Sequence, residues 1–373
     1  MKIYLTATST LPKYKLLYES IHQIISGEKS FEIISSCHGA DCVVCVGDIT
    51  QEVADCKRQE NAAVVRFLFR SDISRHFYTD VTMVDYTFWV SDLDINILCP
   101  YQQTSEKIAV PFDFAPADSE KSDVPKEFDI YVNTGEFLYA DSALFKILRT
   151  LNRLTQLKIE VCSKNESIRH LANPNICISD SSGCIESHVK RAQMVIGSGY
   201  SALFAIKRHK PLIVLGERGY GGIPTPNNIV QFYHEFFQGT IGGRLDGALP
   251  ESLVYEDIMA IRSGKATPDL ASALSQAWLE IKNRITKQIY FLGSLQRQAV
   301  DAGRLRFNTD YTIIQGNGKY WLLNRFTRFI ERKIAPSEFA VIKKYIADDA
   351  RLDDTCNQEE VIELLKNMIL ICG

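Results

Sequence analysis

The stretch that decides the fold spans residues 193–216, and its sequence is QMVIGSGYSALFAIKRHKPLIVLG. Two short apolar runs in it, Gln193–Gly197 and Pro211–Leu215, predict strands, and the apolar pattern of Ser201–Arg208 between them predicts a helix. A strand, a helix and a second strand in this order are typical of a βαβ unit, whose strands pair in parallel. The stretch therefore predicts an α/β fold.

The same alternation continues on both sides of this stretch. In the middle of the chain, further strands are predicted at Phe128–Val132, Leu157–Cys162, Asn175–Ser179 and Gly239–Ile241, and helices at Asp141–Leu154, Ile185–Arg191 and Asn228–Phe237. In the first third, strands are predicted at Lys2–Thr6, Phe31–Ser35, Cys42–Val46, Ala63–Leu68, Thr87–Val90 and Lys107–Val110, with one helix at Tyr14–Ser26. These patterns predict two Rossmann-like domains.

The domains are expected at residues 1–115 and 116–300, with a small module at 301–373. Residues 115–127 are polar with prolines at both ends, which is typical of a linker. The second domain is expected to end in a long helix that begins at Pro268 behind an N-cap at Thr267. Its apolar stripe consists of Leu270, Leu274, Trp278, Ile281, Ile285 and Ile289.

The last module is predicted from a hairpin and two helices. Tyr311–Asn324 has a hairpin pattern with a glycine-rich turn, and Pro336–Ile346 and Gln358–Met368 have helical patterns. We expect a winged-helix-like module, which either packs against the rest of the chain as a structural part or binds a peptide.

Length, charge and hydropathy exclude several classes of protein. At roughly 150 residues per domain, 373 residues predict two to three domains. Lys and Arg number 42 against 45 Asp and Glu, so the chain lacks the basic excess of a nucleic-acid-binding protein. No apolar run reaches the roughly 18 residues of a membrane span, and the N-terminus lacks the pattern of a signal peptide. We expect a cytoplasmic protein with reduced cysteines.

The first candidate site is the turn Gly197-Ser198-Gly199-Tyr200-Ser201, where a predicted strand passes into a helix. Glycines allow a ligand to approach the backbone, and the unpaired amides at a helix start attract a phosphate. Such turns also open many helices that bind nothing, so both interpretations stay open here.

The second candidate site follows the next predicted strand. Residues 216–228 contain four glycines, a Glu-Arg pair and a Pro-Thr-Pro-Asn segment, and Gly242-Gly243-Arg244 comes after the strand predicted at residues 239–241. Ligands of open α/β sheets bind at the carboxyl ends of the strands, where these residues are expected. The alternative is a connecting loop without a ligand.

Further candidates stand at other predicted strand ends. His38 and Asp48 follow strands of the first domain, as do Thr8 and Ser9, and either His38 or Asp48 could act as a catalytic base. Gly135, in the turn after the strand at Phe128–Val132, could contact a phosphate or an acceptor. A solvated histidine and a simple chain reversal are the alternatives.

These residues resemble the nucleotide-sugar-binding half of GT-B-fold glycosyltransferases, over about residues 128–245. The resemblance implies a donor diphosphate held by Gly197, Ser198, Gly199 and Ser201, and a donor pocket shaped by Glu217, Arg218, Gly221, Gly222, Thr225 and Asn228. Arg244 would stabilise the charge on the leaving diphosphate. Such enzymes need no metal and no further cofactor, because the nucleotide-sugar is itself a substrate.

The sequence departs from this family at one position. Members commonly carry a Glu for the donor ribose in the helix after the glycine turn, whereas this chain has Phe204, which cannot accept a hydrogen bond. Either Glu217 takes that task, or the donor differs, or activity has been lost.

Other motifs are incomplete. Cys42 and Cys45 have CxxC spacing, but on a strand they point to opposite faces and cannot share a metal. The turn at Gly197 lacks the Gly-x-Ser-x-Gly pattern of a serine nucleophile, and Ala202 stands where the dinucleotide fingerprint needs its third glycine.

The C-terminal module is similar to the winged-helix peptide-recognition domains of peptide-modifying gene clusters, on Lys319–Asn324 and the helical patterns after it. The resemblance implies peptide binding at the hairpin edge. The sequence as a whole therefore predicts transfer of a sugar from a nucleotide-sugar to a glycan or peptide acceptor. The alternative is an inactive glycosyltransferase-like scaffold whose last module binds a peptide or protein partner.

Overall fold

The computed structural model describes residues 1–60, 62–69, 84–91, 105–115, 125–133, 141–163, 166–179, 184–216, 218–241, 249–264, 269–302, 304–307, 311–316, 319–324, 330–334, 350–351 and 370–372. The chain divides into two compact units. Unit 1 consists of Met1–Trp89, Ile97–Lys107 and Asn283–Gly373, and unit 2 of Val90–Asn96 and Ile108–Lys282. The chain thus enters the main part of unit 2 a few residues before the boundary predicted at residue 115.

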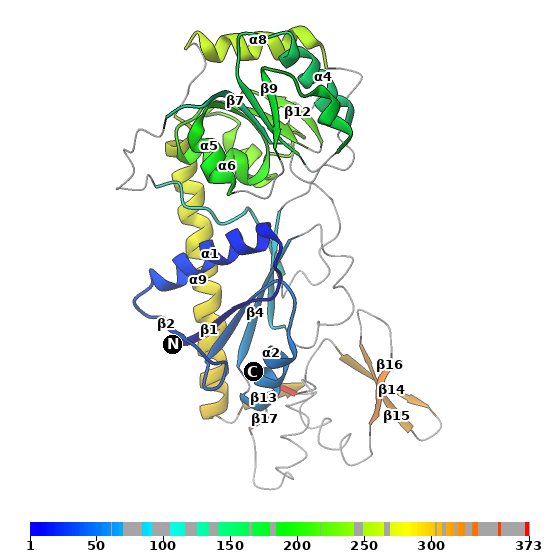
Figure 1. The fold of residues 1–373 in the computed structure, drawn as a ribbon. Coiled ribbons are helices and arrows are strands. Elements are labelled where there is room, and N and C mark those ends of the chain that lie inside the picture. Colours follow the sequence, from blue (N-terminus) through cyan, green and yellow to red (C-terminus); the bar gives the residue numbers. More distant parts are fainter. Residues whose placement is uncertain are drawn as a thin grey trace. The chain divides into compact units, whose positions relative to one another are not determined.

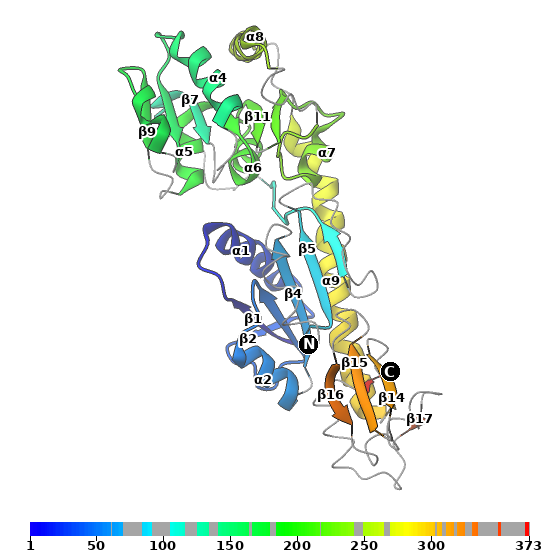
Figure 2. The same cartoon turned by 90° about the vertical axis from the view of Figure 1, so that its right-hand side faces the viewer.

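Unit 1 is built on a six-stranded sheet of order β2-β1-β3-β4-β5-β6. Figure 2 shows β1, β4 and β5 of this sheet. Its strands are β1 (Lys2–Ala7), β2 (Glu32–Ile34), β3 (Cys42–Val46), β4 (Ala63–Phe69), β5 (Tyr86–Val90) and β6 (Ser105–Ile108). Strand β1 pairs in parallel with β2 on one side and β3 on the other, so the strand order reverses between β1 and β3.

Helices α1 and α2 both pack on this sheet. Helix α1 (Pro12–Ser26) starts with a proline at its N-terminus, and its apolar face is buried. Helix α2 (Gln51–Glu60) packs Val53 and Cys56 against Tyr4, Val43 and Val64 of the sheet. The sequence did not predict α2, because its ten residues carry only a narrow apolar face among charged side chains.

Unit 2 contains a second six-stranded sheet, of order β12-β11-β10-β7-β8-β9. The strands are β7 (Phe128–Asn133), β8 (Ile159–Cys162), β9 (Ile176–Ser179), β10 (Ala192–Gly197), β11 (Leu212–Gly216) and β12 (Gly219–Gly222). All pairs are parallel except β11 with β12. Numbered within the unit, this order is 3-2-1-4-5-6, the order of a Rossmann fold. The predicted Rossmann-like character of both sheets is confirmed.

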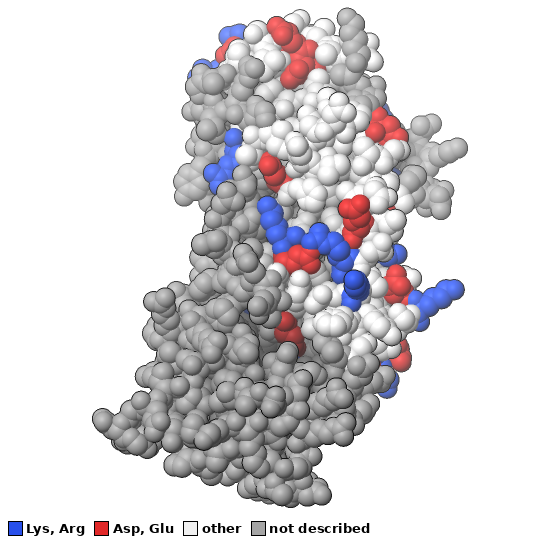
Figure 3. Space-filling model, turned by 180° about the vertical axis from the view of Figure 1, so that it is seen from behind, with Lys and Arg blue, Asp and Glu red and all other residues white. Residues whose placement is uncertain are grey.

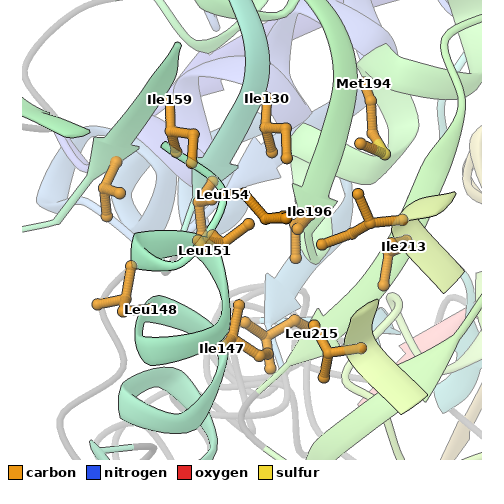
Figure 4. Packing of buried hydrophobic residues seen from close by; sticks show 14 of the residues in the cluster. Ile130, Ile147, Leu148, Leu151, Leu154, Ile159, Met194, Ile196, Ile213 and Leu215 are labelled. Atoms are coloured by element: carbon orange, nitrogen blue, oxygen red, sulfur yellow. The ribbon is translucent and has the colours of Figure 1, made fainter. Parts of the chain in front are cut away.

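Helices cover both faces of the second sheet. On one face, α4 (Asp141–Asn152) and α8 (Glu251–Arg262) share an apolar core with the strands. Figure 4 shows this packing for Leu148 and Leu151 of α4 and for Ile130 and Ile196 of the sheet. On the other face lie α5 (Ile185–Arg191) and α6 (Gly199–Lys207) (Figure 1). This two-sided burial explains why the strands are almost continuously apolar.

The structure corrects one strand. Residues 239–241 form no strand, because Gly239 adopts a φ of +81° and its backbone passes against that of Gly219. The strand in this region is β12, whose four residues the sequence had assigned to a loop. Helix α7 (Ile229–His234) is shorter than predicted, and α8 had no predicted counterpart.

The long helix is α9 (Leu270–Ala302), which extends beyond Ile289, the last residue of the predicted stripe. Its stripe is buried at Leu274, Ile281 and Ile285. Asp269 caps it, since Oδ1 accepts the Ser272 amide at 3.3 Å. The predicted cap, Thr267, lies outside the described residues.

The C-terminal residues form two small sheets. One has the order β17 (Ala350–Arg351), β13 (Arg304–Phe307), β18 (Leu370–Cys372), and the other β14 (Tyr311–Gly316), β15 (Lys319–Asn324), β16 (Ile330–Ile334). The antiparallel pairing of β14 with β15 confirms the predicted hairpin. The predicted helices at 336–346 and 358–368 lie outside the described residues, so the winged-helix-like module stays a prediction. Among the described helices, none is long and apolar enough to cross a membrane.

Candidate functional site

The strand order of unit 2 reverses between β7 and β10, and the carboxyl ends of these strands meet at Asn133 and Gly197. Ser198 follows as the N-cap residue of α6, with an extended backbone, and its side chain makes no capping hydrogen bond. In open α/β sheets, ligands bind at this reversal. The predicted turn therefore stands at the position where the fold would place a ligand.

Packing within the turn explains two of its residues. Ser201 is 1% exposed, and its hydroxyl donates to the Ser198 carbonyl at 2.7 Å. A Cβ atom on Gly197 would lie 2.5 Å from Ser201 Oγ and 3.0 Å from the Asn133 carbonyl oxygen. Gly197 and Ser201 thus shape the turn itself, and the hydroxyl of Ser198 is the polar side-chain group that the turn leaves unused.

A segment that the sequence did not single out covers this edge. We call Phe236–Gly239 the strap. The Gly199 amide donates to the Phe236 carbonyl at 3.0 Å, and a Cβ atom on Gly199 would lie 3.1 Å from the Phe236 ring. The Phe236 ring also meets Tyr200 edge to face, with centroids 5.2 Å apart.

The strap then crosses the end of β11. The Arg218 amide donates to the Gln238 carbonyl at 2.8 Å. A Cβ atom on Gly216 would collide with the backbone of Gln238, and one on Gly239 with the backbone of Gly219. Close backbone contact thus requires one glycine at the end of β11, Gly216, and one in the strap, Gly239, which accounts for both without a ligand.

The remaining donor-pocket candidates are spread along the β11–β12 hairpin and beyond it. Arg218 lies at the hairpin tip, and its exposed side chain makes no hydrogen bond or ion pair with any described residue. Gly222 pairs with Val214, so β12 carries Gly221 and Gly222 back from the carboxyl edge. These two glycines are therefore not brought together with the turn at Gly197.

Thr225 and Asn228 form a turn of their own before α7. The Thr225 amide donates to Asn228 Oδ1 at 2.7 Å, and the Asn228 amide donates back to the Thr225 carbonyl at 3.1 Å. Glu217, Arg244 and Gly135 lie outside the described residues, so their predicted roles stay predictions.

Phe204 belongs to the core. It is 7% exposed, and its ring meets Phe112 edge to face at 5.2 Å between centroids. The family resemblance implies a ribose-binding glutamate at this position, but here the side chain packs against an aromatic ring.

Unit 1 has a corresponding reversal at the carboxyl ends of β1 and β3. The Asp48 amide donates to Thr8 Oγ1 at 2.6 Å, and Gly47 between the strand and Asp48 has a φ of +105°. A Cβ atom on Gly47 would lie 2.8 Å from Thr8 Oγ1, so this turn also requires glycine. The exposed Asp48 thus stands where an α/β unit binds ligands, as predicted from its position after β3.

His38 lines a pocket of about 440 Å³ in unit 1. The pocket lies between the loop after β2 and one side of α2, and its described lining residues are Cys37, His38, Glu52, Asp55 and Cys56. Tyr4 donates to Glu52 Oε1 at 3.1 Å, and burial followed by this contact raises the pKa of Tyr4. The volume is within the range of small-ligand sites. Asp48 is not among the lining residues, so the two candidate bases belong to different places.

The cysteines of the described residues form no metal site. Cys45 Sγ donates to the Asp48 carbonyl at 2.8 Å, whereas Cys42 is buried elsewhere in the core and burial raises its thiol pKa. Both are free thiols. No three His, Cys, Asp or Glu side chains in the described parts of the chain are placed to hold a metal ion.

On the face in Figure 3, the described Lys and Arg side chains lie beside Asp and Glu rather than forming a basic surface. Burial, and then the neighbouring Lys126, lower the pKa of Lys210 to about 7, but Lys210 donates to the Ala192 carbonyl at the amino end of β10. This unusual lysine therefore lies at the wrong end of the sheet for the candidate site.

No protein-family model matches this chain, and no curated protein matches it. Solved structures similar to it include Anabaena HepE in complex with UDP, with 12% identity, 78% of this chain and 100% of that chain covered, and a TM-score of 0.48. S. aureus MnaA with UDP is similar to this chain with 14% identity and a TM-score of 0.44, and the match covers 78% of this chain and 97% of that chain. The pneumococcal O-GlcNAc transferase GtfA in complex with UDP and GlcNAc is similar with 12% identity and a TM-score of 0.42, and the match covers 74% of this chain and 60% of that chain. At these TM-scores, the likeness supports no conclusion about the chemistry of this chain.

Proposed function

We propose that unit 2 binds a nucleoside diphosphate-sugar at the carboxyl ends of β7 and β10, and that the protein transfers the sugar to an acceptor. The observation that carries the proposal is the 3-2-1-4-5-6 strand order, whose reversal coincides with the turn at Gly197 and the start of α6. A phosphate there would face the N-terminus of α6.

Two described side chains support a diphosphate at this edge. Ser198 has a hydroxyl without a capping bond at the start of α6. Arg218 places an exposed guanidinium at the tip of the neighbouring hairpin, and guanidinium groups bind phosphate through two parallel hydrogen bonds. Glu217 and Arg244 are the further donor contacts that we propose from the sequence.

Binding is tested by thermal shift of the full chain with UDP, GDP, CDP and dTDP. A nucleotide at 100 times its Kd stabilises the folded protein by about 2.7 kcal/mol, which raises its melting temperature. Ser198→Ala and Arg218→Ala should each weaken the response. Matched controls are Ser187→Ala, at the start of α5, and Arg262→Ala, at the end of α8, which should leave it unchanged.

Transfer also requires an acceptor site, and we propose the pocket beside His38 in unit 1. The His38 imidazole would take the proton of an acceptor hydroxyl as the new bond to the sugar forms and the diphosphate leaves. Asp48 is the second candidate base. In an assay of nucleotide release from a matching sugar donor, His38→Ala should lower kcat by about 10²–10⁴-fold, whereas the exposed His22→Ala should not.

The alternative function is a scaffold that binds no nucleotide. The occupied Gly199 amide and the apolar surroundings of Phe204 favour it, because both remove contacts that a donor would use. In that case the C-terminal residues would bind a peptide or protein partner. Absence of any thermal response to all four nucleotides would support the scaffold and contradict the transferase.

A further inference from the structure

Two lysine side chains meet at the amino end of β10, away from the candidate site. Lys210 Nζ donates to the Ala192 carbonyl at 2.6 Å and to the Lys190 carbonyl at 3.5 Å. Lys126 Nζ donates to the same Lys190 carbonyl at 3.3 Å. Amines that share one oxygen atom lie close together, and two positive charges at such a distance repel each other. One of the two amines therefore favours its neutral form.

In the described parts of the chain, no carboxylate forms an ion pair with either amine to offset this repulsion. The nearby carboxylates are bound by other cations. Arg191 Nη1 lies 2.7 Å from Glu127 Oε2, and Glu186 binds Arg208 and, at 3.8 Å, the Lys190 ammonium. The two amines are therefore held only by backbone carbonyls.

Lys210 is the amine that gives up its proton, because its side chain is half-buried whereas Lys126 is exposed. Burial, then Lys126 and after it Arg208, lower the pKa of Lys210 to about 7. A neutral amine has two N–H groups, and the carbonyls of Lys190 and Ala192 accept both. Its lone pair is then left to attack an electrophile, as in other lysines activated by desolvation and a neighbouring cation.

The charges beside Lys210 select the kind of electrophile. The Lys126 ammonium is exposed, and the Arg208 guanidinium adds a second positive charge to the surroundings of Lys210. Lysine ammonium groups bind phosphate. A reagent that carries a phosphate on its electrophilic carbon would thus be attracted to Lys126 and attacked by Lys210. Acyl phosphates combine these two features in one small molecule.

We propose that Lys210 is an acylation site whose reagent is a small acyl phosphate. Lys126 binds the phosphate while Lys210 Nζ attacks the carbonyl carbon. The N–C bond forms, the C–O bond to phosphate breaks, and the proton of the amine leaves with the phosphate as hydrogen phosphate. The product is a neutral amide, which ends the repulsion between the two side chains. This site is independent of the proposed nucleotide site, which lies at the other end of β10.

The first test incubates the full chain with acetyl phosphate and follows each lysine by peptide mass spectrometry. At pH 7, Lys210 should be acetylated at least about tenfold faster than the exposed Lys29, because an ordinary lysine with a pKa of about 10.4 is almost fully protonated there. The rate at Lys210 should level off above about pH 8, whereas the rate at Lys29 should keep rising. Equal rates at the two lysines overturn the proposal.

The second test replaces the neighbouring amine. Lys126→Gln removes both the repelling charge and the phosphate contact, so acetylation of Lys210 at pH 7 should slow at least about threefold. Lys126→Arg keeps the charge and should react nearly as the unchanged chain does, as should the distant control Lys29→Gln. An unchanged rate in Lys126→Gln overturns the role of the pair.

Uncharged acetic anhydride separates the reactive amine from its reagent. It should also acetylate Lys210 in preference to Lys29 at pH 7, since the neutral fraction of Lys210 does not depend on the reagent. Lys126→Gln should slow this reaction less than it slows the reaction with acetyl phosphate, because only the latter uses the phosphate contact. A preference for Lys210 with the anhydride but not with acetyl phosphate overturns the acyl phosphate as the reagent of this site.

Discussion

Replacement of Lys57 tests the buried ion pair that ties α2 to the start of β5. Lys57 Nζ lies 2.5 Å from Asp85 Oδ2, and the two side chains are 1% and 15% exposed. The same carboxylate oxygen accepts the Val64 amide at 2.6 Å. The pair therefore links α2, β4 and the residue before β5, and it is largely inaccessible to solvent.

The size of the effect follows from what Lys57→Met leaves behind. Removing one partner of a buried pair leaves the other charge uncompensated, which costs about 3–5 kcal/mol. Asp85 keeps its hydrogen bond from Val64 and is partly exposed, so we expect the lower end, about 3 kcal/mol. That loss corresponds to a more than roughly 100-fold smaller folding equilibrium constant.

Urea-induced unfolding at pH 7, followed by circular dichroism, measures this loss. Lys29→Met, at an exposed position, is the matched control and should stay within about 0.5 kcal/mol of the unchanged chain. Adding Asp85→Asn to Lys57→Met should recover part of the stability, because the amide oxygen can still accept from Val64. A loss below about 1 kcal/mol for Lys57→Met would refute the reasoning, since exposed ion pairs contribute that much.

Three further changes test the core, a cap and a buried amine. Leu151→Ala removes a fully buried side chain and should cost about 2–5 kcal/mol in urea unfolding, against little change for Leu279→Ala, which is 47% exposed. Asp269→Ala should cost about 0.5–2 kcal/mol at pH 7; because side-chain hydrogen bonding lowers the pKa of Asp269 in the folded chain, the difference should shrink as the pH falls below the ordinary carboxyl pKa of 3.8. The pKa of Lys210 is lowered on folding to about 7, so the unfolded chain binds more protons above that pH and stability should rise from pH 7 toward 10; Lys210→Met should lack this rise when unfolding is measured across the range.

The site candidates show where sequence reasoning stops. Asp48 and the turn at Gly197 were expected at carboxyl strand ends, and the sheets place them there because both follow strands of parallel sheets. The pocket beside His38 was not foreseen, since Glu52 and Asp55 face it from a helix whose weak apolar pattern gave no signal. The strap was missed for another reason: Phe236 and Gly199 are far apart in the sequence, and only their hydrogen bond reveals the contact.

The sequence by itself determined the α/β class and most strand positions, because strands buried on both faces must be short apolar runs whatever their neighbours are. It could not determine what the glycines at 199, 216 and 219 are for, since glycine permits a close approach without specifying by what. The tertiary structure decided this for two of them: the Phe236 ring lies where a side chain of Gly199 would lie, and the Gln238 backbone lies where one of Gly216 would lie. It also decided the strand orders, and with them the two reversals at which ligands are expected, because strand pairing depends on contacts between distant segments.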